Sequence, residues 1–362
     1  MEGRMHVKCI GIICGGKSVE HEVSLQSAKN IIQVLEQTYQ VVVIGISKQG
    51  LWYVIDLAKL KQKYLQEAMF ALEEGSNLLE KPLSFDLLKN MIDLAFCVVH
   101  GAYGEDGCIQ GLLRCLDIAF IGPSVLDAAL CMDKDICKRL LQAEGIVMAK
   151  FLTYKAHDHF SFEEVVFKLG LPLFIKPSNS GSSLGVAKVV NESEFKIAIE
   201  EAFKYDHKIL IEEAIVGREI ECSVLGNDQP RASLPGEVIP THEFYSYEAK
   251  YLDDKGAEFA LPALLEDVTR DQIQELAVKI FKSLGCHGMA RVDFFLDNQG
   301  VVYFNEINTI PGFTQISLYP KLWEVSGLAI THLLDNLIQL ALEKYSKDRA
   351  ILTSATTIYI EG

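Results

Sequence analysis

The sequence predicts an α/β protein whose N-terminal domain, residues 1–127, contains a parallel sheet. In this part, short apolar runs such as VKCIGIICGG and VVVIGIS alternate with helical patterns. Residues 128–225 continue with strand-like runs around a small-residue loop, and residues 226–362 contain a strand hairpin and a long apolar helix. Alternating strands and helices are typical of layered α/β domains. We therefore expect three closely packed regions.

The composition narrows the classes of partner. Of the 362 residues, 49% are hydrophobic and 23% are charged, as in ordinary globular proteins. The formal net charge of −15 argues against nucleic acid as a partner, and any anionic ligand would need a local cluster of cations. Nine cysteines without CxxC spacing indicate reduced thiols of a cytoplasmic protein rather than disulfides or a metal site.

Neither end of the chain predicts a membrane segment. The N-terminus runs into a strand-like segment too soon for a signal peptide. The most apolar long stretch, SGLAITHLLDNLIQLALEKY, is interrupted by Asp335 and Asn336, and its apolar residues follow helical spacing. We expect a packed helix here and no membrane partner.

The first region, residues 1–127, is predicted to alternate between strands and helices. Apolar runs predict parallel strands near 7–16, 41–47, 93–101 and 118–122, and the stripe Ala28, Ile31, Ile32, Leu35 predicts a helix over 23–35. Residues 57–92 are rich in Lys, Leu, Gln and Glu, which favours a helical insertion.

The second and third regions follow in the same way. The second contains a helix from near Met132, strands near 171–177, 185–190 and 208–215, and a helix near 193–204. The third contains a strand over 218–226, a polar loop over 241–257, a helix over 269–284 and strands over 290–297 and 301–308.

The loop SNSGSSLGV, residues 178–186, lies between two strand-like runs. Its backbone N–H groups and the hydroxyls of Ser182 and Ser183 are suited to phosphate oxygens, and Lys176 ends the strand before it. It is not a Walker loop, because no GK[ST] follows. A plain hairpin loop remains the alternative.

Two further glycine turns follow apolar strands. GIICGGKSVEHEVS lacks the GxGxxG spacing of a dinucleotide site, which argues against a nicotinamide enzyme. Within it, Glu20 either meets the ammonium group of a ligand or is a helix-start acid that favours the helix dipole. In HGAYGEDGCIQG, His100, Glu105 and Asp106 lie in a turn after a buried strand, a place where functional residues gather.

ARVDFFLD and VVYFNEIN predict an antiparallel hairpin. Alternation places Arg291, Asp293 and Phe295 on one face, and Glu306 and Asn308 on one face of the partner strand. The partner face should also include Val302 and Phe304.

If Asp297 pairs with Gly300, Arg291 lies opposite Glu306 and Asp293 lies opposite Phe304. Asp293, Glu306 and Asn308 then offer converging oxygen atoms of the kind that Mg²⁺ prefers. A salt-bridged surface around Arg291 is the alternative.

Eight motifs together resemble the D-alanine–D-alanine ligases of the ATP-grasp superfamily, in the longer form with a helical insertion. They are GGKSVEHEVS, HGAYGEDGCIQG, MDK, KPSNSGSSLGV, LIEEAIVGRE, FYSYEAKY, ARVDFF and NEINTIPGFTQIS, in the order and spacing of the family over nearly the whole chain. The resemblance implies a two-lobed ATP-grasp fold after the N-terminal domain. It also implies a homodimer that joins two D-alanine molecules for peptidoglycan synthesis through an acyl phosphate, using ATP and two Mg²⁺ ions or Mn²⁺.

The resemblance also implies roles for residues toward ATP and the metals. Asp293, Glu306 and Asn308 would bind the metal ions, with Glu306 bridging them. The residues that would surround ATP are Lys134, Lys176, Ser183 and Lys250 at the phosphates, Glu212 and the backbone at Ile215 at the adenine, Glu219 near the ribose, and Phe295.

Further roles implied by the resemblance concern the amino acids. Glu20 would bind the first ammonium group, with His100 nearby. The oxyanion would be stabilised by Arg291 and the N–H of Gly312, the second carboxylate would be seated by Ser317 and Leu318, and Ser182 and Tyr251 would complete a hydrogen-bonded set with Glu20. Tyr251 favours D-alanine as the second substrate. The alternatives are a D-alanine:D-lactate or D-alanine:D-serine ligase and a non-catalytic ATP-grasp sensor.

Overall fold

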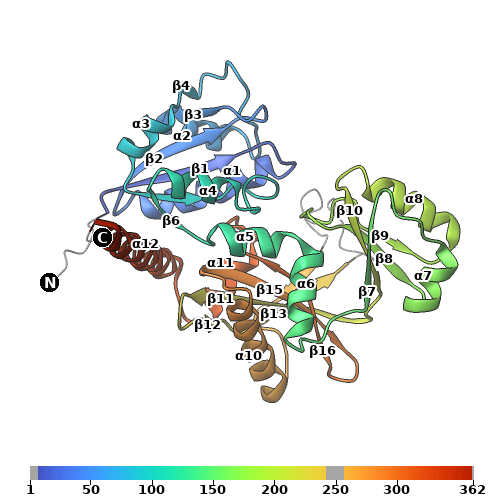
Figure 1. The fold of residues 1–362 in the computed structure, drawn as a ribbon. Coiled ribbons are helices and arrows are strands. Elements are labelled where there is room, and N and C mark those ends of the chain that lie inside the picture. Colours follow the sequence, from blue (N-terminus) through green and yellow to red (C-terminus); the bar gives the residue numbers. More distant parts are fainter. Residues whose placement is uncertain (1–6, 242–256, 361–362) are drawn as a thin grey trace.

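The computed structural model describes residues 7–241 and 257–360, which form three sheets and the helices around them (Figure 1). The first sheet has the order β4-β3-β2-β1-β5-β6. Its strands are β1 (Cys9–Gly15), β2 (Gln40–Ile46), β3 (Trp52–Ile55), β4 (Leu79–Pro82), β5 (Leu94–Cys97) and β6 (Ala119–Ile121).

The predicted parallel sheet is confirmed for β2, β1, β5 and β6. Strands β3 and β4 add an antiparallel edge that the sequence reading missed. The insertion is helical only at α2 (Leu57–Gln66) and α3 (Phe85–Met91), with β4 between them. Hydrogen bonding of β4 to β3 thus overrides the helix-favouring composition of the insertion.

Helices cover both faces of this sheet. On one face, α1 (His21–Leu35) and α12 (Ile330–Ile360) contribute buried residues to the core with β1 and β5. On the other face, α3 and α4 (Cys108–Cys115) pack against the same strands. Since both faces are buried, the central strands are apolar throughout, and all seven residues of β1 are buried.

The second sheet is antiparallel, with the order β7-β10-β8-β9. It contains β7 (Phe151–Lys155), β8 (Leu173–Pro177), β9 (Ala187–Val189) and β10 (Lys208–Glu213), and α7 (Phe162–Leu169) and α8 (Glu192–Ala202) cover its outer face. The aromatic and aliphatic side chains of these helices form a separate core with the sheet. Neither β7 nor α7 was predicted.

The third sheet has the order β14-β13-β11-β15-β16, with β12 paired to β11. Its strands are β11 (Gly217–Gly226), β12 (Arg231–Ala232), β13 (Gly236–Pro240), β14 (Ala257–Ala260), β15 (Gly288–Asp297) and β16 (Val302–Asn308). Helices α5 (Val125–Met132), α6 (Lys134–Ala143) and α10 (Asp267–Ser283) pack against this sheet and share a core with β11, β15 and β16. The predicted domain limits at 127/128 and 225/226 stay a prediction; by hydrogen bonding, β11 belongs to this third sheet.

The hairpin of β15 and β16 is confirmed, but its predicted register is wrong. Leu296 pairs with Val302, one residue away from the expected register at the turn, and a bulge leaves Asn305 unpaired, so that Asp293 lies opposite Glu306 and Arg291 opposite Asn308. The bulge also changes which residues share a face. Val302 and Phe304 join the apolar core instead of the face of Glu306.

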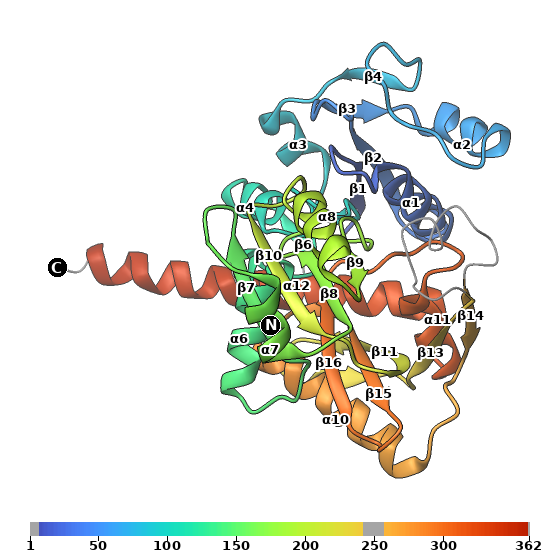
Figure 2. The same cartoon turned by 90° about the vertical axis from the view of Figure 1, so that its right-hand side faces the viewer.

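The C-terminal helix is packed at its start, as predicted. Leu333, Leu334, Leu337 and Ile338 are buried in the core under the first sheet. Figure 2 shows the far end of α12 running out beyond the body of the molecule. In the described part of the chain, no single helix is long and apolar enough to cross a membrane, although α11 (Leu318–Val325) and α12 up to Ile351, bent by 108°, meet that test as a pair.

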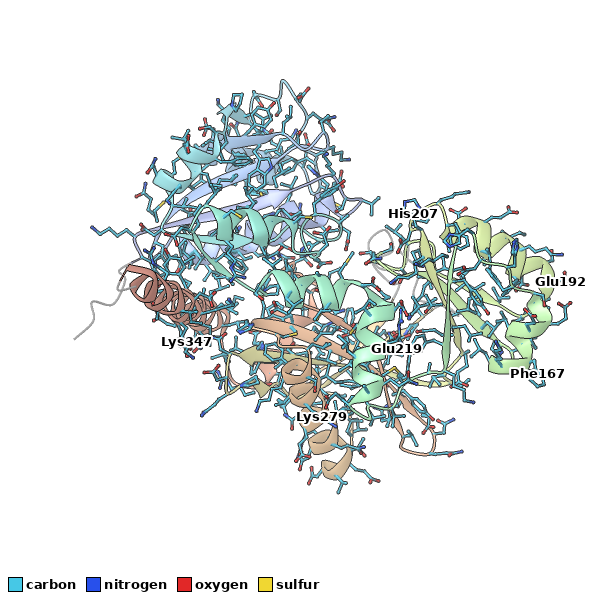
Figure 3. The ribbon with its side chains drawn as sticks, in the orientation of Figure 1. Phe167, Glu192, His207, Glu219, Lys279 and Lys347 are labelled. Atoms are coloured by element: carbon cyan, nitrogen blue, oxygen red, sulfur yellow. The ribbon has the colours of Figure 1, made fainter. Side chains whose placement is uncertain are left out.

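We predict that Phe281→Ala lowers the free energy of unfolding by about 3–5 kcal/mol, because the fully buried ring of α10 would leave a cavity in the core. Urea unfolding followed by circular dichroism measures the change. Phe167→Ala is the matched control, because its ring is 91% exposed (Figure 3) and its loss should change stability by no more than about 0.5 kcal/mol. Equal losses in the two variants would contradict the assigned core.

Candidate active site

Two connected cavities lie where the three sheets meet. A cleft of about 530 Å³ separates the second sheet from the third, and a smaller cavity of about 150 Å³ lies between the N-terminal domain and the third sheet. Both are lined by Lys134, Gly181, Ser182, Val238 and Glu306. A ligand in the cleft would therefore touch one in the smaller cavity at this junction.

A lysine–glutamate cluster forms one wall of the cleft. Glu212 on β10 is buried, with Lys176 Nζ of β8 2.6 Å from its Oε2 and Lys138 Nζ of α6 2.8 Å from its Oε1. Burial raises the pKa of Glu212, but the charges of Lys138 and Lys176 outweigh burial and the pKa lies below its ordinary value. Burial lowers the pKa of Lys138, and Glu212 opposes this change. The carboxylate is thus ionised between two ammonium groups.

Lys134 reaches the junction from the start of α6. The carboxylate of Asp133 caps this helix by accepting the N–H of Ile136 at 3.2 Å. The Lys134 ammonium donates to the carbonyl oxygen of Ser180 at 2.7 Å and lies 3.4 Å from Glu306 Oε2. It therefore links the loop of the second sheet to the hairpin of the third.

The loop of residues 178–186 holds two serines in the left-handed backbone region. Their φ angles are 53° at Ser182 and 59° at Ser183, a conformation that costs energy for non-glycine residues and gathers at functional sites. Ser182 Oγ donates to Glu20 Oε1 across the domains. Glu20 begins α1, yet its side chain makes no capping bond to that helix. Glu20 thus lies at the start of α1, where its charge favours the helix dipole, and its side chain also reaches Ser182, so both interpretations of Glu20 stay open.

The other residues predicted at ATP lie along the same cleft. Ser183, Ile215, Glu219 and Phe295 line it, and Figure 3 shows Glu219 between the second and third sheets. Glu213, the residue after Glu212 on β10, also lines the cleft. Its carboxylate accepts the backbone N–H of Lys150 at 2.9 Å.

His100 is buried beside the smaller cavity. Its Nδ1 lies 3.1 Å from the carbonyl oxygen of Ile310 and 3.8 Å from Glu105 Oε1, and its Nε2 lies 3.1 Å from Ser27 Oγ. Burial lowers the pKa of His100, but the hydrogen bond and charge of Glu105 outweigh it, and the charge of Glu20 adds to the same effect. The pKa of His100 is therefore raised.

The turn after β16 brings backbone to the cavity. A Cβ added at Gly312 would lie 2.6 Å from Ser317 Oγ, so a larger residue would displace this hydroxyl. Ser317 precedes the first residue of α11, Leu318, and its hydroxyl accepts the N–H of Thr314 at 2.9 Å. Ser317 and Leu318 line the cavity, so the N-terminal end of α11 lies beside it, and a helix N-terminus favours an anion.

The polar face of the hairpin pairs a cation with two acids. The guanidinium of Arg291 donates from Nε and Nη2 to Asp293 at 2.8 and 2.7 Å, and its Nε lies 2.8 Å from Glu221 Oε2. Burial lowers the pKa of Arg291, but these carboxylates outweigh it and raise the pKa well above its ordinary value. Glu221 on β11 lies opposite Asp293.

The oxygen atoms of Asp293, Glu306 and Asn308 fit a magnesium site of the open kind. Asp293 and Glu306 are directly paired across the strands, and Asn308 lies two residues along the same face. The described residues hold no group of three or more His, Cys, Asp or Glu side chains that would bind a metal alone. Mg²⁺ usually takes one or two carboxylates together with waters and substrate phosphates. Asp293 would share its oxygens between such an ion and Arg291.

Two predicted residues, Lys250 and Tyr251, lie outside the described residues. Asp293 pairs with Arg291, which lines the cavity, and Asp106 accepts backbone N–H groups of its own turn instead of lining either space. The other predicted residues line the cleft or the cavity directly.

Comparison with protein families decides the relationship. The model of the D-ala D-ala ligase N-terminus matches residues 9–123, and the model of the D-ala D-ala ligase C-terminus matches residues 140–339.

The chain belongs to the D-alanine–D-alanine ligase family.

Relatives within this family match along almost the full length. The D-alanine–D-alanine ligase of Oceanobacillus iheyensis is 49% identical, covering 96% of this chain and 98% of the relative. D-alanine–D-alanine ligase A of Escherichia coli K12 is 48% identical over 95% and 98%.

Solved structures agree and confirm the ATP-grasp fold. The D-alanine–D-alanine ligase from Coxiella burnetii superposes with a TM-score of 0.82 at 37% identity, covering 97% of this chain and 99% of that one. The VanG D-Ala:D-Ser ligase from Enterococcus faecalis gives 0.77 at 36% identity, covering 93% and 100%.

The sequence reading of this ligase-family site missed Lys138 and Glu221. Lys138 follows Lys134 by four residues on α6, and Glu221 follows Glu219 by two on β11. These spacings place each residue on the same face as its predicted neighbour. Helical and strand periodicity could therefore have found both.

We predict that Glu105→Gln lowers the pKa of His100. The pKa of the wild-type imidazole should lie above its ordinary value of about 6.5. Without the charge of Glu105, less of the pKa-lowering effect of burial is offset. NMR titration of the histidine ring signals measures both values. Asp106→Asn in the same turn is the control, because Asp106 contacts backbone N–H groups of its own loop instead of His100. An unchanged pKa in Glu105→Gln would contradict the assigned pairing.

Proposed function

We propose that this protein joins two D-alanine molecules into D-alanyl-D-alanine for cell wall synthesis and converts ATP to ADP and phosphate. The observation that supports this most strongly is the junction of a nucleotide-sized cleft with a smaller polar cavity at Lys134, Ser182 and Glu306. A phosphoryl group passed across this junction would meet a carboxylate held in the smaller cavity. The family relationship supplies the amino acid substrate.

ATP occupies the cleft between the second and third sheets in this proposal. Lys134 and Lys176 supply local positive charge in a protein of net charge −15, and Ser183 adds a donor at the phosphates. Glu212 and the backbone at Ile215 border the adenine. Glu219 lies within reach of the ribose, and Phe295 covers the base from the third sheet.

Asp293, Glu306 and Asn308 would hold two Mg²⁺ ions, or Mn²⁺. Bound there, the metal neutralises the charge that repels an attacking carboxylate from the triphosphate. The chain assists by placing Lys134 beside Glu306.

The two D-alanine molecules share the smaller cavity. The ammonium group of the first pairs with Glu20, which Ser182 holds in position, and His100 lies close by. Its carboxylate attacks the γ-phosphate, which forms an acyl phosphate and releases ADP. The amine of the second attacks the acyl carbon and loses a proton as phosphate leaves.

Groups at the far side of the cavity stabilise that second step. Arg291 and the N–H of Gly312 face the oxyanion that develops on the acyl carbon. Ser317 and Leu318, at the start of α11, seat the carboxylate of the second D-alanine. Lys250 and Tyr251 remain assigned to the phosphates and to the Glu20 set by family resemblance.

We place the enzyme in the cytoplasm as a homodimer. The nine free cysteines, seven of them buried, fit a reducing compartment. The dimer rests on family resemblance.

A D-alanine:D-serine ligase is the second candidate, because VanG is among the similar structures. The third and fourth candidates are a D-alanine:D-lactate ligase and a non-catalytic ATP-grasp sensor. The full set of Arg291, Asp293, Glu306 and Asn308 argues against the sensor, which has little use for a metal site and an oxyanion site together.

Incubation with ATP, Mg²⁺ and D-alanine tests the proposal. We expect equimolar phosphate and D-alanyl-D-alanine, measured by a coupled phosphate assay and mass spectrometry. L-alanine should give neither, and added D-serine or D-lactate should give no more than a small share of mixed product. A predominance of mixed product would favour the D-alanine:D-serine or the D-alanine:D-lactate ligase. No phosphate release under any condition would favour the non-catalytic ATP-grasp sensor.

Glu306→Gln should lower kcat by at least about a hundredfold, because an amide replaces a carboxylate that holds the metal beside the phosphates. Steady-state rates over a range of Mg²⁺ measure the loss, and Mn²⁺ binding followed by electron paramagnetic resonance reports the site directly. Glu324→Gln on α11, remote from both cavities' linings, is the matched control. A wild-type rate at low Mg²⁺ would refute the ligand assignment.

A further inference from the structure

The buried lysine of the cleft wall has no role in the proposed mechanism. Lys138 is only 1% exposed, and it is held by Glu212 on one side and by the rings of Phe151 and Phe304 at 5.9 Å each. A buried ammonium group is costly unless a partner offsets its charge. Glu212 is that partner, yet Glu212 already has Lys176 at 2.6 Å.

The charges around Glu212 add up to one excess cation. One carboxylate lies between two ammonium groups, so a single positive charge is left over. Lys138 and Lys176 both line the cleft, but Lys138 is only 1% exposed and its ammonium group lies against two aromatic rings, whereas Lys176 is 9% exposed. The surplus charge is therefore offered to a ligand mainly through Lys176.

We infer that Lys138 is a positioning residue that neutralises Glu212 and thereby leaves the charge of Lys176 free for the phosphates of ATP. Without Lys138, Glu212 would hold Lys176 in a one-to-one ion pair, and the phosphates would lose one of their cations. The inference rests on the proposed binding of ATP in this cleft.

The geometry favours a charge effect over a hydrogen-bond effect. Among the described residues, neither Lys138 Nζ nor Glu212 Oε1 makes a well-directed hydrogen bond, although the two atoms are 2.8 Å apart. Lys138 therefore acts on Glu212 mainly through its charge, which a neutral side chain of similar length cannot replace. Replacing both members of the pair by neutral groups should remove the need for Lys138.

Calorimetric titration with Mg²⁺–ATP, without D-alanine, tests the inference on the wild type and four variants. K138M should raise the Kd for ATP by about tenfold or more, because a charge-assisted contact to phosphate is lost. The Kd of adenosine, which has no phosphate, should change by less than about threefold, since the contacts to the base remain. K344M is the matched control, because Lys344 forms a 2.8 Å ion pair with Asp348 on α12, far from the cleft, and should bind ATP as the wild type does.

The double variant K138M/E212Q separates charge neutralisation from packing. Glutamine keeps an acceptor for the base but no longer competes for Lys176, so the double variant should bind ATP within about threefold of E212Q alone. This comparison also holds if K138M by itself does not fold, because removing both buried charges is tolerated better than removing one.

Three results would overturn the inference: unchanged ATP affinity in K138M, equal weakening of ATP and adenosine, or a tenfold loss in K138M/E212Q relative to E212Q. Failure of the wild type to bind ATP would instead overturn the proposed function along with it.

Discussion

Charge balance at Glu306 is the constraint on which the rest of the site depends. The protein has a net charge of −15, yet its proposed reaction brings a carboxylate to a triphosphate. Glu306 therefore needs cations from another part of the chain, and Lys134 reaches it from α6 at 3.4 Å. The three sheets lie next to one another (Figure 1), and residues of the first and third sheets and of the loop of the second sheet line the cavities at their junction.

Each sheet supplies a different set of side chains to that junction. The first sheet ends in glycine turns that place Glu20 and His100, and the second supplies Lys176, Glu212 and the serine loop. The third supplies the acidic hairpin face and the turn at Gly312. The bonds that cross between these parts, from Ser182 to Glu20 and from His100 to Ile310, hold the two substrate cavities in contact.

Local patterns predicted most of this arrangement, and long-range pairing explains what they missed. The alternating apolar runs gave the parallel strands correctly, and the motifs named the residues that line both cavities. The β3–β4 edge was missed because its strands are short and depend on pairing with β2. The hairpin register was wrong because alternation cannot reveal a bulge, here at Asn305. Helical spacing from Lys134 could have placed Lys138 at the site, but only the folded structure shows that Lys138 meets Glu212.

The central claim is that the face of Asp293, Glu306 and Asn308 binds the metal between the nucleotide and the amino acid. Anomalous diffraction from crystals grown with Mn²⁺, ADP and a phosphorylated phosphinate analogue of D-alanine tests it most directly. We expect manganese peaks in contact with oxygen atoms of these three side chains, with Lys134 turned toward the transferred phosphate. Manganese peaks bound only by nucleotide and water, away from this face, would contradict it.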